Sequence, residues 1–218
     1  MTKKKKNTAK ERILKAAISL FAHRGYSAVG VREIASKAEV NIAMISYYFQ
    51  GKVGILQEIL DHFFDDYFDI FKKVVKEKKS SEKIMQTLLH SLFQFVQENT
   101  ELALVVYNIF PLYIPEIAEK KSKRIHDIFN TVSEVIKAYG LDPEDKILLS
   151  MLAPSIFSLL ITHFRFKPHQ KHLFNIDFDE SFYQRYTGFI EAFVLSGISG
   201  IAEMEHNKKR FRNENGDR

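Results

Sequence analysis

Two short segments with apolar faces, separated by a tight turn, constrain the fold of this chain more than any other feature. Residues 31–36 and 42–49 each have the length of about two helical turns, and only residues 37–41 lie between them. A connection of this kind is as short as a helix-turn-helix requires. The apolar positions of the pair are expected to form a small shared core: Ile34, Ala35, Ala38, Val40, Ile45, Tyr48 and Phe49.

The second segment has an outward face that suits the major groove of DNA. Its residues are small, polar or aromatic and carry no charge: Asn41, Ile42, Ala43, Met44, Ser46 and Tyr47. Asn41 is a favourable N-cap for this helix. A face of this composition can contact base edges, thymine methyl groups and phosphates. The pattern therefore predicts a recognition helix.

These residues resemble the N-terminal DNA-binding domain of TetR-type transcriptional regulators. The resemblance runs from about Thr8 to Leu60 and depends on the order and spacing of several fragments: residues 13–21, Gly25-Tyr26, residues 31–35, and Tyr47-Tyr48-Phe49 followed by Lys52. Two positions depart from the family pattern. Gly30 stands where Ser or Thr commonly caps the second helix and contacts a phosphate, and Tyr48 stands where His is common. Glycine is a tolerable N-cap, so the first departure removes a DNA contact without preventing the fold.

The resemblance implies an all-α chain, with an N-terminal three-helix helix-turn-helix domain joined to a C-terminal helical domain for ligand binding and dimerisation. The expected DNA contacts form two groups. Base edges are expected to meet Asn41, Ala43, Met44 and Ser46, with Ile42 on the same face. Phosphates are expected to meet Arg32, Tyr47, Tyr48 and Lys52.

Hydrophobic periodicity predicts about nine helices and no strand. Besides the two motif helices, the predicted helices cover residues 9–23, from 52 to about 75, from 81 to about 96, 102–110, 115–139, from 142 to about 166, and 179–205. Ser81 and the pair Asp142-Pro143 are expected to start helices, and Gly140 is expected to stop one. Pro154 is expected to kink or split its helix, and residues 167–177 are expected to form a loop.

Net charge differs along the chain and sets the expected domain boundaries. Residues 1–52 hold 11 Lys and Arg against three Glu, a net charge of +8, whereas residues 53–207 carry −6 and residues 208–218 carry +3. A basic domain ahead of an acidic body favours DNA binding at the N-terminal end. We expect a DNA-binding domain with a basic tail at 1–52, a ligand-binding and dimerisation domain at 53–206, and a basic tail at 207–218. The lysine run at 3–6 is equally compatible with a solubilising tail.

The last two predicted helices are apolar over most of their circumference, which predicts a partner for them. In the family this pair of helices forms a four-helix bundle with its two-fold mate. The expected dimer interface contains Leu152, Ile156, Leu159, Phe189, Phe193, Gly197 and Ile201. The alternative is that both helices are buried within one monomer.

Aromatic residues of the C-terminal part are the best candidates for a ligand site. In the resembling family a small apolar ligand enters a cavity among the fourth to eighth helices, and such cavities are lined by aromatics with few polar groups. The candidate lining is Phe63, Tyr67, Phe71, Leu88, Leu92, Tyr107, Phe110, His126, Phe129 and Phe157. Each of these residues taken singly is better explained as ordinary core than as a ligand contact.

The remaining patterns do not indicate an enzyme. His169 and His172 have metal-ligand spacing but fall in the predicted loop, and Asp61, Asp65, Asp66 and Asp69 are interpreted as a solvated helix face. No glycine-rich phosphate loop or nucleophile elbow accompanies these residues, and the chain has no cysteine. We therefore expect no catalytic residues, no metal and no cofactor.

Together these observations predict a cytoplasmic, homodimeric, ligand-responsive transcriptional regulator. We expect a repressor that is released from a palindromic duplex operator by a small, apolar or aromatic inducer. No run of 18 uninterrupted apolar residues occurs, so no membrane span is expected. The alternative is a helical scaffold or effector whose basic ends bind another protein or an anionic membrane surface. That alternative leaves the helix-turn-helix pattern unexplained.

Overall fold

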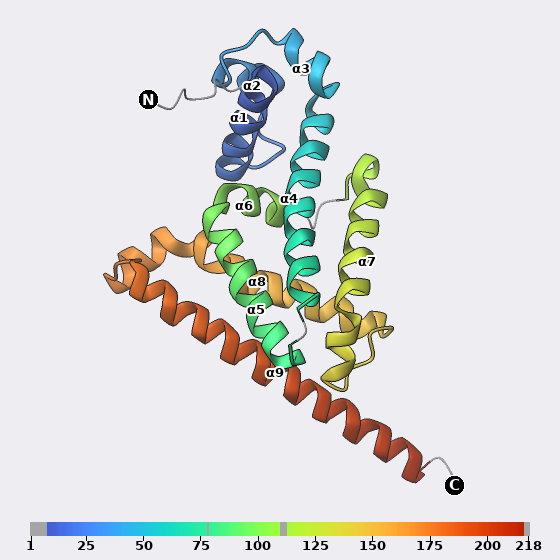
Figure 1. Cartoon of the computed structure of the whole chain (residues 1–218). Coiled ribbons are helices and arrows are strands. Elements are labelled where there is room, and N and C mark those ends of the chain that lie inside the picture. Colours follow the sequence, from blue (N-terminus) through green and yellow to red (C-terminus); the bar gives the residue numbers. More distant parts are fainter. Residues whose placement is uncertain (1–7, 78, 110–112, 216–218) are drawn as a thin grey trace. The chain divides into compact units, whose positions relative to one another are not determined.

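A computed structural model of the chain describes residues 8–77, 79–109 and 113–215, and these form nine helices and no strand (Figure 1). The all-α prediction is confirmed. The helices are α1 (Ala9–Arg24), α2 (Val31–Lys37), α3 (Ala43–Phe49), α4 (Lys52–Val75), α5 (Ser81–Glu98), α6 (Thr100–Ile109), α7 (Pro115–Ala138), α8 (Lys146–Phe174) and α9 (Glu180–Asn215). They divide into two compact units. Unit 1 comprises residues 1–67 and 99–124, and unit 2 comprises residues 68–98 and 125–218.

Unit 1 is built around α1, which packs against α2, α3 and α6. Thr8 and Glu11 form a capping box at its start: the Thr8 hydroxyl accepts from the Glu11 amide, and the Glu11 carboxylate accepts from the Thr8 amide. Ile13 and Phe21 of α1 are almost fully buried, as are Ile34 of α2 and Ile45 of α3. Burial of these side chains is the main force that holds three such short helices together.

The predicted boundary at residue 52 falls inside unit 1 rather than between units. The physical reason is that α6, which follows α5 in the chain, packs directly against α1. A polar contact accompanies this packing, because the Ser19 hydroxyl donates to Glu101 of α6 at 3.4 Å. The helix-turn-helix therefore shares its structural unit with α6 and with the first part of α7.

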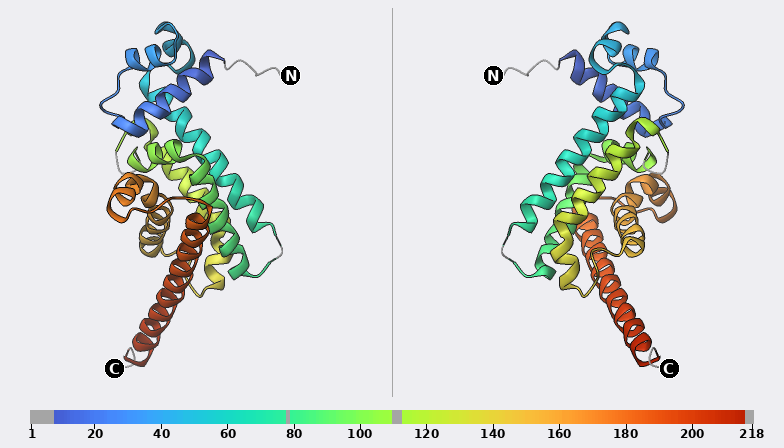
Figure 2. Two further views of the ribbon diagram at one scale, coloured as in Figure 1. Left: turned by 90° about the vertical axis from the view of Figure 1, so that its left-hand side faces the viewer. Right: turned by 90° about the vertical axis from the view of Figure 1, so that its right-hand side faces the viewer.

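Unit 2 is organised by α5, α8 and α9, which pack against one another in pairs. Ile190, Val194 and Ile198 of α9 are buried at four-residue spacing and form the side of that helix that faces inward. Its C-terminal end extends away from α5 and α8, as the two side views show (Figure 2). α9 ends at Asn215, beyond the predicted end at residue 205.

The prediction of a loop at residues 167–177 is wrong for most of its length. α8 continues as helix to Phe174, with Pro154 and Pro168 inside it, and ends at Asn175 in a left-handed conformation. A tertiary contact holds the extra turns, because the Lys167 ammonium donates to the Tyr183 hydroxyl of α9 at 2.9 Å. Within α8, Gln170 is hydrogen-bonded to His163. The polar residues that suggested a solvated loop thus belong to the helix, where Lys167 and Gln170 are half-buried and His169, Lys171 and His172 are exposed.

Two predicted N-caps are also wrong by one turn or less. α8 begins at Lys146, and its cap is Asp145, whose Oδ1 accepts from the amides of Ile147 and Leu148, each at 3.0 Å. Asp142 instead accepts from the Glu144 amide at 2.9 Å in the preceding turn. At α5 the hydroxyl that accepts from a first-turn amide belongs to Ser80 rather than Ser81.

The reassigned cap yields a matched pair of variants. Asp145→Ala should lower the free energy of unfolding by about 1 kcal/mol, because two amides of the first turn lose their acceptor. Asp142→Ala, which removes only a turn contact, should cost less than about 0.5 kcal/mol. Urea unfolding followed by circular dichroism measures both. Equal losses, or a larger loss for Asp142→Ala, would contradict the reassignment.

Candidate nucleic-acid interface

The turn between α2 and α3 is closed by backbone bonds and one side chain. The Val40 amide donates to the Ala35 carbonyl at 3.1 Å, and Glu39 adopts a positive φ of 53°. Gly30 is the N-cap of α2 and makes no side-chain cap bond, as predicted. α3 begins at Ala43 rather than at Ile42, and Asn41 accepts from the Ala43 amide at 2.9 Å through its Oδ1. Asn41 therefore stabilises the start of the helix from one residue further back than expected.

The two sides of α3 differ in burial as the sequence predicted, with two exceptions. Ile45 and Phe49 are buried, whereas Asn41, Ile42, Ala43, Ser46 and Tyr47 are exposed. Met44 is only half-buried, so part of its side chain packs inside. Tyr48 was placed in the shared core, but it lies at the surface with its ring edge-on to Tyr47 at 4.9 Å. Two adjacent tyrosines thus stand on the open side of the recognition helix.

Lys52, the first residue of α4, is held by an aromatic ring that the sequence analysis did not assign to the site. Its ammonium lies 4.1 Å from the centre of the Tyr26 ring, a cation–π contact. Partial burial lowers the pKa of Lys52, and burial together with the charge of Glu116 raises the pKa of Tyr26. The sequence pattern includes Tyr26 only as part of the Gly25-Tyr26 break between helices. The contact orients the Lys52 side chain before any phosphate arrives.

The cations of the domain fall into two classes. Arg24 pairs with Glu33, Lys10 lies 2.6 Å from Glu58, and Lys37 donates to the Ser19 hydroxyl at 2.9 Å. These cations tie helices of unit 1 together. Arg32 is exposed and makes no ion pair among the described residues, which leaves its guanidinium available for a phosphate.

The predicted ligand-site residues differ in burial. Phe63, Phe71, Leu88 and Leu92 are buried, and Tyr67, Tyr107, Phe129 and Phe157 are half-buried. His126 is exposed, and Phe110 lies outside the described residues. Within unit 1 the Phe63 ring stacks on Tyr67 at 5.2 Å, and burial raises the pKa of the Tyr67 phenol, which keeps it neutral. Phe63 and Tyr67 belong to unit 1, and Phe71, Leu88 and Leu92 belong to unit 2.

The predicted dimer residues lie on helices with a large exposed apolar surface. Phe189 and Phe193 are each 55% exposed, and Gly197 is exposed on the same side of α9. Leu152, Ile156, Leu159 and Ile201 are half-buried. Ile147 and Met151 of α8 are 74% and 57% exposed. Much of the apolar surface of both helices therefore lacks cover within one chain.

By length and composition, α8 and residues Glu180–Asn207 of α9 could each cross a membrane, with mean hydropathies of 1.9 and 1.2 in an 18-residue stretch. Long core helices of soluble proteins have the same property. The absence of a membrane-spanning helix therefore stays a prediction. The dimer, which would cover the same apolar helices, stays a prediction as well.

The histidine and aspartate clusters weighed in the sequence have identifiable surroundings. His169 and His172 lie on α8 rather than in a loop, and no group of three potential metal ligands occurs among the described residues. Asp61 and Asp65 are not a purely solvated face, because they pair with Lys120 and Arg124 of α7. Asp66 lies 3.3 Å from His62 on the same helix.

His163 is the one buried polar side chain of the described core, with 1% of its surface exposed. Its Nδ1 lies 2.7 Å from the Gln170 side-chain oxygen, so Nδ1 carries the proton of the neutral ring. Its Nε2 is buried without a hydrogen-bond partner in the described part of the chain. The rings of Phe164, Phe178, Phe182, Tyr183 and Tyr186 surround it at 4.9–5.7 Å. Burial, with the nearby Lys167 charge, lowers the pKa of His163 against the opposing effect of Gln170.

This burial predicts a dependence of stability on pH. The unfolded chain binds a proton at His163 as the pH falls below about 6.5, whereas the folded chain resists it, so stability is full above that pH and declines below it. His163→Phe should remove part of this decline. Free energies of unfolding at pH 7.5 and 5.5 measure it, with His169→Phe as the control at an exposed histidine. An undiminished decline in His163→Phe would contradict the assignment.

Known proteins match the chain in two ways. Residues 13–59 match the family described as bacterial regulatory proteins, tetR family. The Bacillus subtilis (strain 168) protein called Probable HTH-type transcriptional regulator YttP is 45% identical over 58 residues, which are 27% of this chain and 28% of that protein. An HTH-type transcriptional repressor of Mycobacterium tuberculosis is 40% identical over 50 residues, which are 23% of this chain and 27% of that protein. The matched part is thus about a quarter of the length of these curated relatives, which are regulators and not enzymes.

The fold itself extends further than the sequence match. The structure of the fatty acid degradation regulator FadR from Bacillus halodurans superposes with a TM-score of 0.70 at 18% identity. The alignment covers 90% of this chain and 98% of that one. At this identity the likeness shows a common fold, and it supports the arrangement of a helix-turn-helix domain followed by a helical C-terminal part.

Proposed function

We propose that the chain, whose residues 13–59 match the tetR family of bacterial regulatory proteins, is a homodimeric repressor that a ligand releases from DNA. The operator would be a palindromic duplex, and the inducer a small, largely apolar molecule. The protein would act in the cytoplasm, where an operator is accessible. It would need no metal and no cofactor.

The observation that carries the proposal is the open face of α3. Asn41, Ile42, Ala43 and Ser46 are exposed, uncharged and small enough for close approach to base edges. Two tyrosines stand beside them, and Arg32 and Lys52 lie on the flanking helices α2 and α4. Contacts that read sequence would therefore lie at the centre of the face, and contacts that hold phosphates would lie around it.

The dimer follows from the exposed surface of α8 and α9. One exposed stripe along α9 carries no charged or polar side chain. Its residues recur every three or four positions: Phe189, Phe193, Gly197, Gly200 and Met204. Gly197 and Gly200 would let a second helix approach closely. A second copy also supplies the second recognition helix that a two-fold operator requires.

Induction is proposed to act through α4. Only two residues separate this helix from α3, and it carries the stacked rings of Phe63 and Tyr67. A ligand that contacts these rings would tilt α4 and displace α3 from the groove. A change of the DNA-competent population from 99:1 to 1:99 requires a preference of about 5.5 kcal/mol for the other state. The common fold with a fatty acid degradation regulator is compatible with an apolar ligand.

The decisive experiment is selection of random duplex DNA by the purified chain at roughly 150 mM salt, where nonspecific phosphate binding is suppressed. Enrichment of a palindromic site would support the dimeric repressor and give the spacing of its half-sites. Binding that is only salt-sensitive, with no enriched sequence, would contradict it. Binding to anionic vesicles in place of DNA would favour the scaffold or membrane alternative.

On the selected site, two kinds of variant should behave differently. Lys52→Ala should weaken binding on all sequences and reduce the slope of log affinity against log salt by about 1, because one phosphate contact is lost. Tyr26→Leu should weaken binding about two- to fivefold by releasing Lys52, while Tyr26→Phe should not. Met44→Ala should change the preferred bases. Fluorescence anisotropy across a salt series distinguishes them, and a sequence-specific effect of Lys52→Ala would overturn the assignment.

The dimer interface can be tested separately from DNA. Phe193→Glu should convert the protein from a dimer to a monomer of 25.4 kDa, because a carboxylate would be buried against an apolar stripe. Gln184→Glu introduces the same charge at an exposed position of α9 outside the stripe and should leave the dimer intact. Sedimentation equilibrium gives both masses. A monomeric wild-type chain, or a dimer that survives Phe193→Glu, would contradict this interface.

A further inference from the structure

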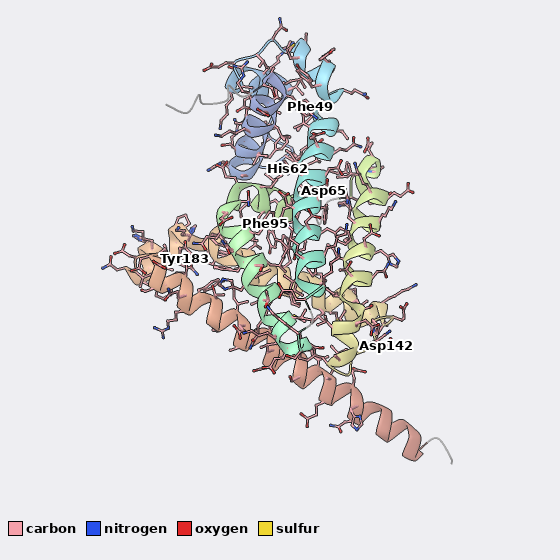
Figure 3. The ribbon with its side chains drawn as sticks, in the orientation of Figure 1. Phe49, His62, Asp65, Phe95, Asp142 and Tyr183 are labelled. Atoms are coloured by element: carbon pink, nitrogen blue, oxygen red, sulfur yellow. The ribbon has the colours of Figure 1, made fainter. Side chains whose placement is uncertain are left out.

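Three polar contacts join α4 to α7 within unit 1, each at an offset of 59 residues. The Gln57 side-chain amide donates to the Glu116 carbonyl at 3.2 Å, Asp61 pairs with Lys120, and Asp65 lies 2.5 Å from Arg124. We name this set the α4–α7 zipper. Because each contact lies four residues beyond the last on both helices, the two helices run in the same direction here, side by side (Figure 1). Asp65 is labelled on α4 in Figure 3.

The order of charges favours the observed register. If α4 slipped by four residues, or about 6 Å, in one direction, Asp65 and Asp69 would face Lys120 and Arg124, but Asp61 would face Glu116, and two negative charges would meet. A slip of the same size in the other direction would place Asp61 beside Arg124 but leave Lys120 facing the neutral Gln57 and leave Asp65 without its partner. The observed register combines one hydrogen bond with three ion pairs, since Arg124 also lies 4.0 Å from Asp61, and it brings no like charges together.

The apolar surface beneath the zipper does not select a register by itself. A shallow hollow at this point is lined by Leu60, Phe64 and Ile117 together with the zipper residues Gln57, Asp61, Lys120 and Arg124. The three apolar side chains are buried, and their contact is largely non-directional. Side chains of Asp61 and Arg124 are only 30% and 27% exposed, which makes their ion pairs less screened than fully solvated ones.

We infer that Asp61, Asp65, Lys120 and Arg124 are positioning residues that set the axial position of α4 and hence the placement of α3 on DNA. The inference rests on the proposed function as a DNA-binding regulator. An axial step of about 6 Å carries the start of α4 with it, and only two residues separate that start from the end of α3. Such a step exceeds the reach of hydrogen bonds to base edges.

Charge reversal separates positioning from a simple effect of charge on DNA. Asp61→Lys adds positive charge and Lys120→Asp adds negative charge, so a pure field effect would strengthen binding in one and weaken it in the other. Positioning predicts that both lose affinity for the selected operator, by about tenfold each. The double variant Asp61→Lys with Lys120→Asp restores the ion pair with its charges exchanged and should return to within about threefold of the wild type. Recovery is not expected to be complete, because the new ammonium at position 61 would lie near the Arg124 guanidinium.

Two measurements keep a folding defect from imitating this result. Lys123→Asp makes the same charge change at an exposed residue of α7 that has no ion pair among the described residues, and it should lose little specific affinity. The melting temperature of each variant is recorded as well. If both single reversals melt far below the wild type, Asp61→Asn and Lys120→Gln replace them. They should lose affinity in the same direction.

The register can be read without DNA, because the chain contains no cysteine that would interfere. Gln57→Cys with Glu116→Cys should form a disulfide readily, and Gln57→Cys with Lys120→Cys should not. Equal crosslinking of the two pairs would overturn the zipper whatever the protein binds. Operator binding that is unchanged in both reversals would overturn the positioning role while leaving the proposed function intact. If the Gln57→Cys, Glu116→Cys variant crosslinks selectively but the wild-type chain enriches no DNA, the proposed function is refuted and, with it, the positioning role on DNA. Only the register then stands.

Discussion

The recognition helix cannot move independently, because only Gln50 and Gly51 separate it from α4. Both linking residues adopt positive φ values, 59° and 120°, and the Gln50 amide closes the end of α3 on the Ser46 carbonyl. The first turn of α4 also approaches α3 closely, since a Cβ atom on Gly54 would lie 1.6 Å from the Phe49 carbonyl oxygen. Because the connection is this short and closely packed, the direction of α3 follows the direction of α4.

Everything that holds α4 in unit 1 therefore bears on the direction of α3, the proposed recognition helix. Its apolar side, with Ile55, Leu56 and Ile59, is fully buried and resists separation from the domain. Its polar sides make directional contacts: Glu58 with Lys10 of α1, and the α4–α7 zipper. The apolar contacts supply most of the stability, while the polar contacts choose one position among several of similar burial. This division also explains why aspartates with no catalytic surroundings line one side of α4.

Sequence reasoning located the helix-turn-helix because its parts depend on local rules. The short helices, the tight turn and the buried Ile34, Ile45 and Phe49 all follow from spacing and helix signals. The same reasoning failed where distant contacts decide. Residues around Lys167 form helix where Lys167 contacts Tyr183 of α9, and Tyr26 meets Lys52 because α4 brings the ammonium above its ring. Asp145 was passed over as a cap because Asp142-Pro143 is the stronger local signal. The ligand-site and dimer residues remain predictions, since they depend on a ligand and on a second chain.

The packing of α6 on α1 has a consequence for how this protein can be divided. Leu102, Ala103 and Val106 of α6 are buried, and they come from chain that lies some 50 residues beyond the end of the helix-turn-helix. A fragment cut at residue 52 would carry α1 without α6, the helix it packs against. A chimera that joined the helix-turn-helix domain of this chain to the C-terminal part of another regulator would also lack the α6 surface. The helix-turn-helix domain is exchangeable only together with the α6 surface that completes its fold.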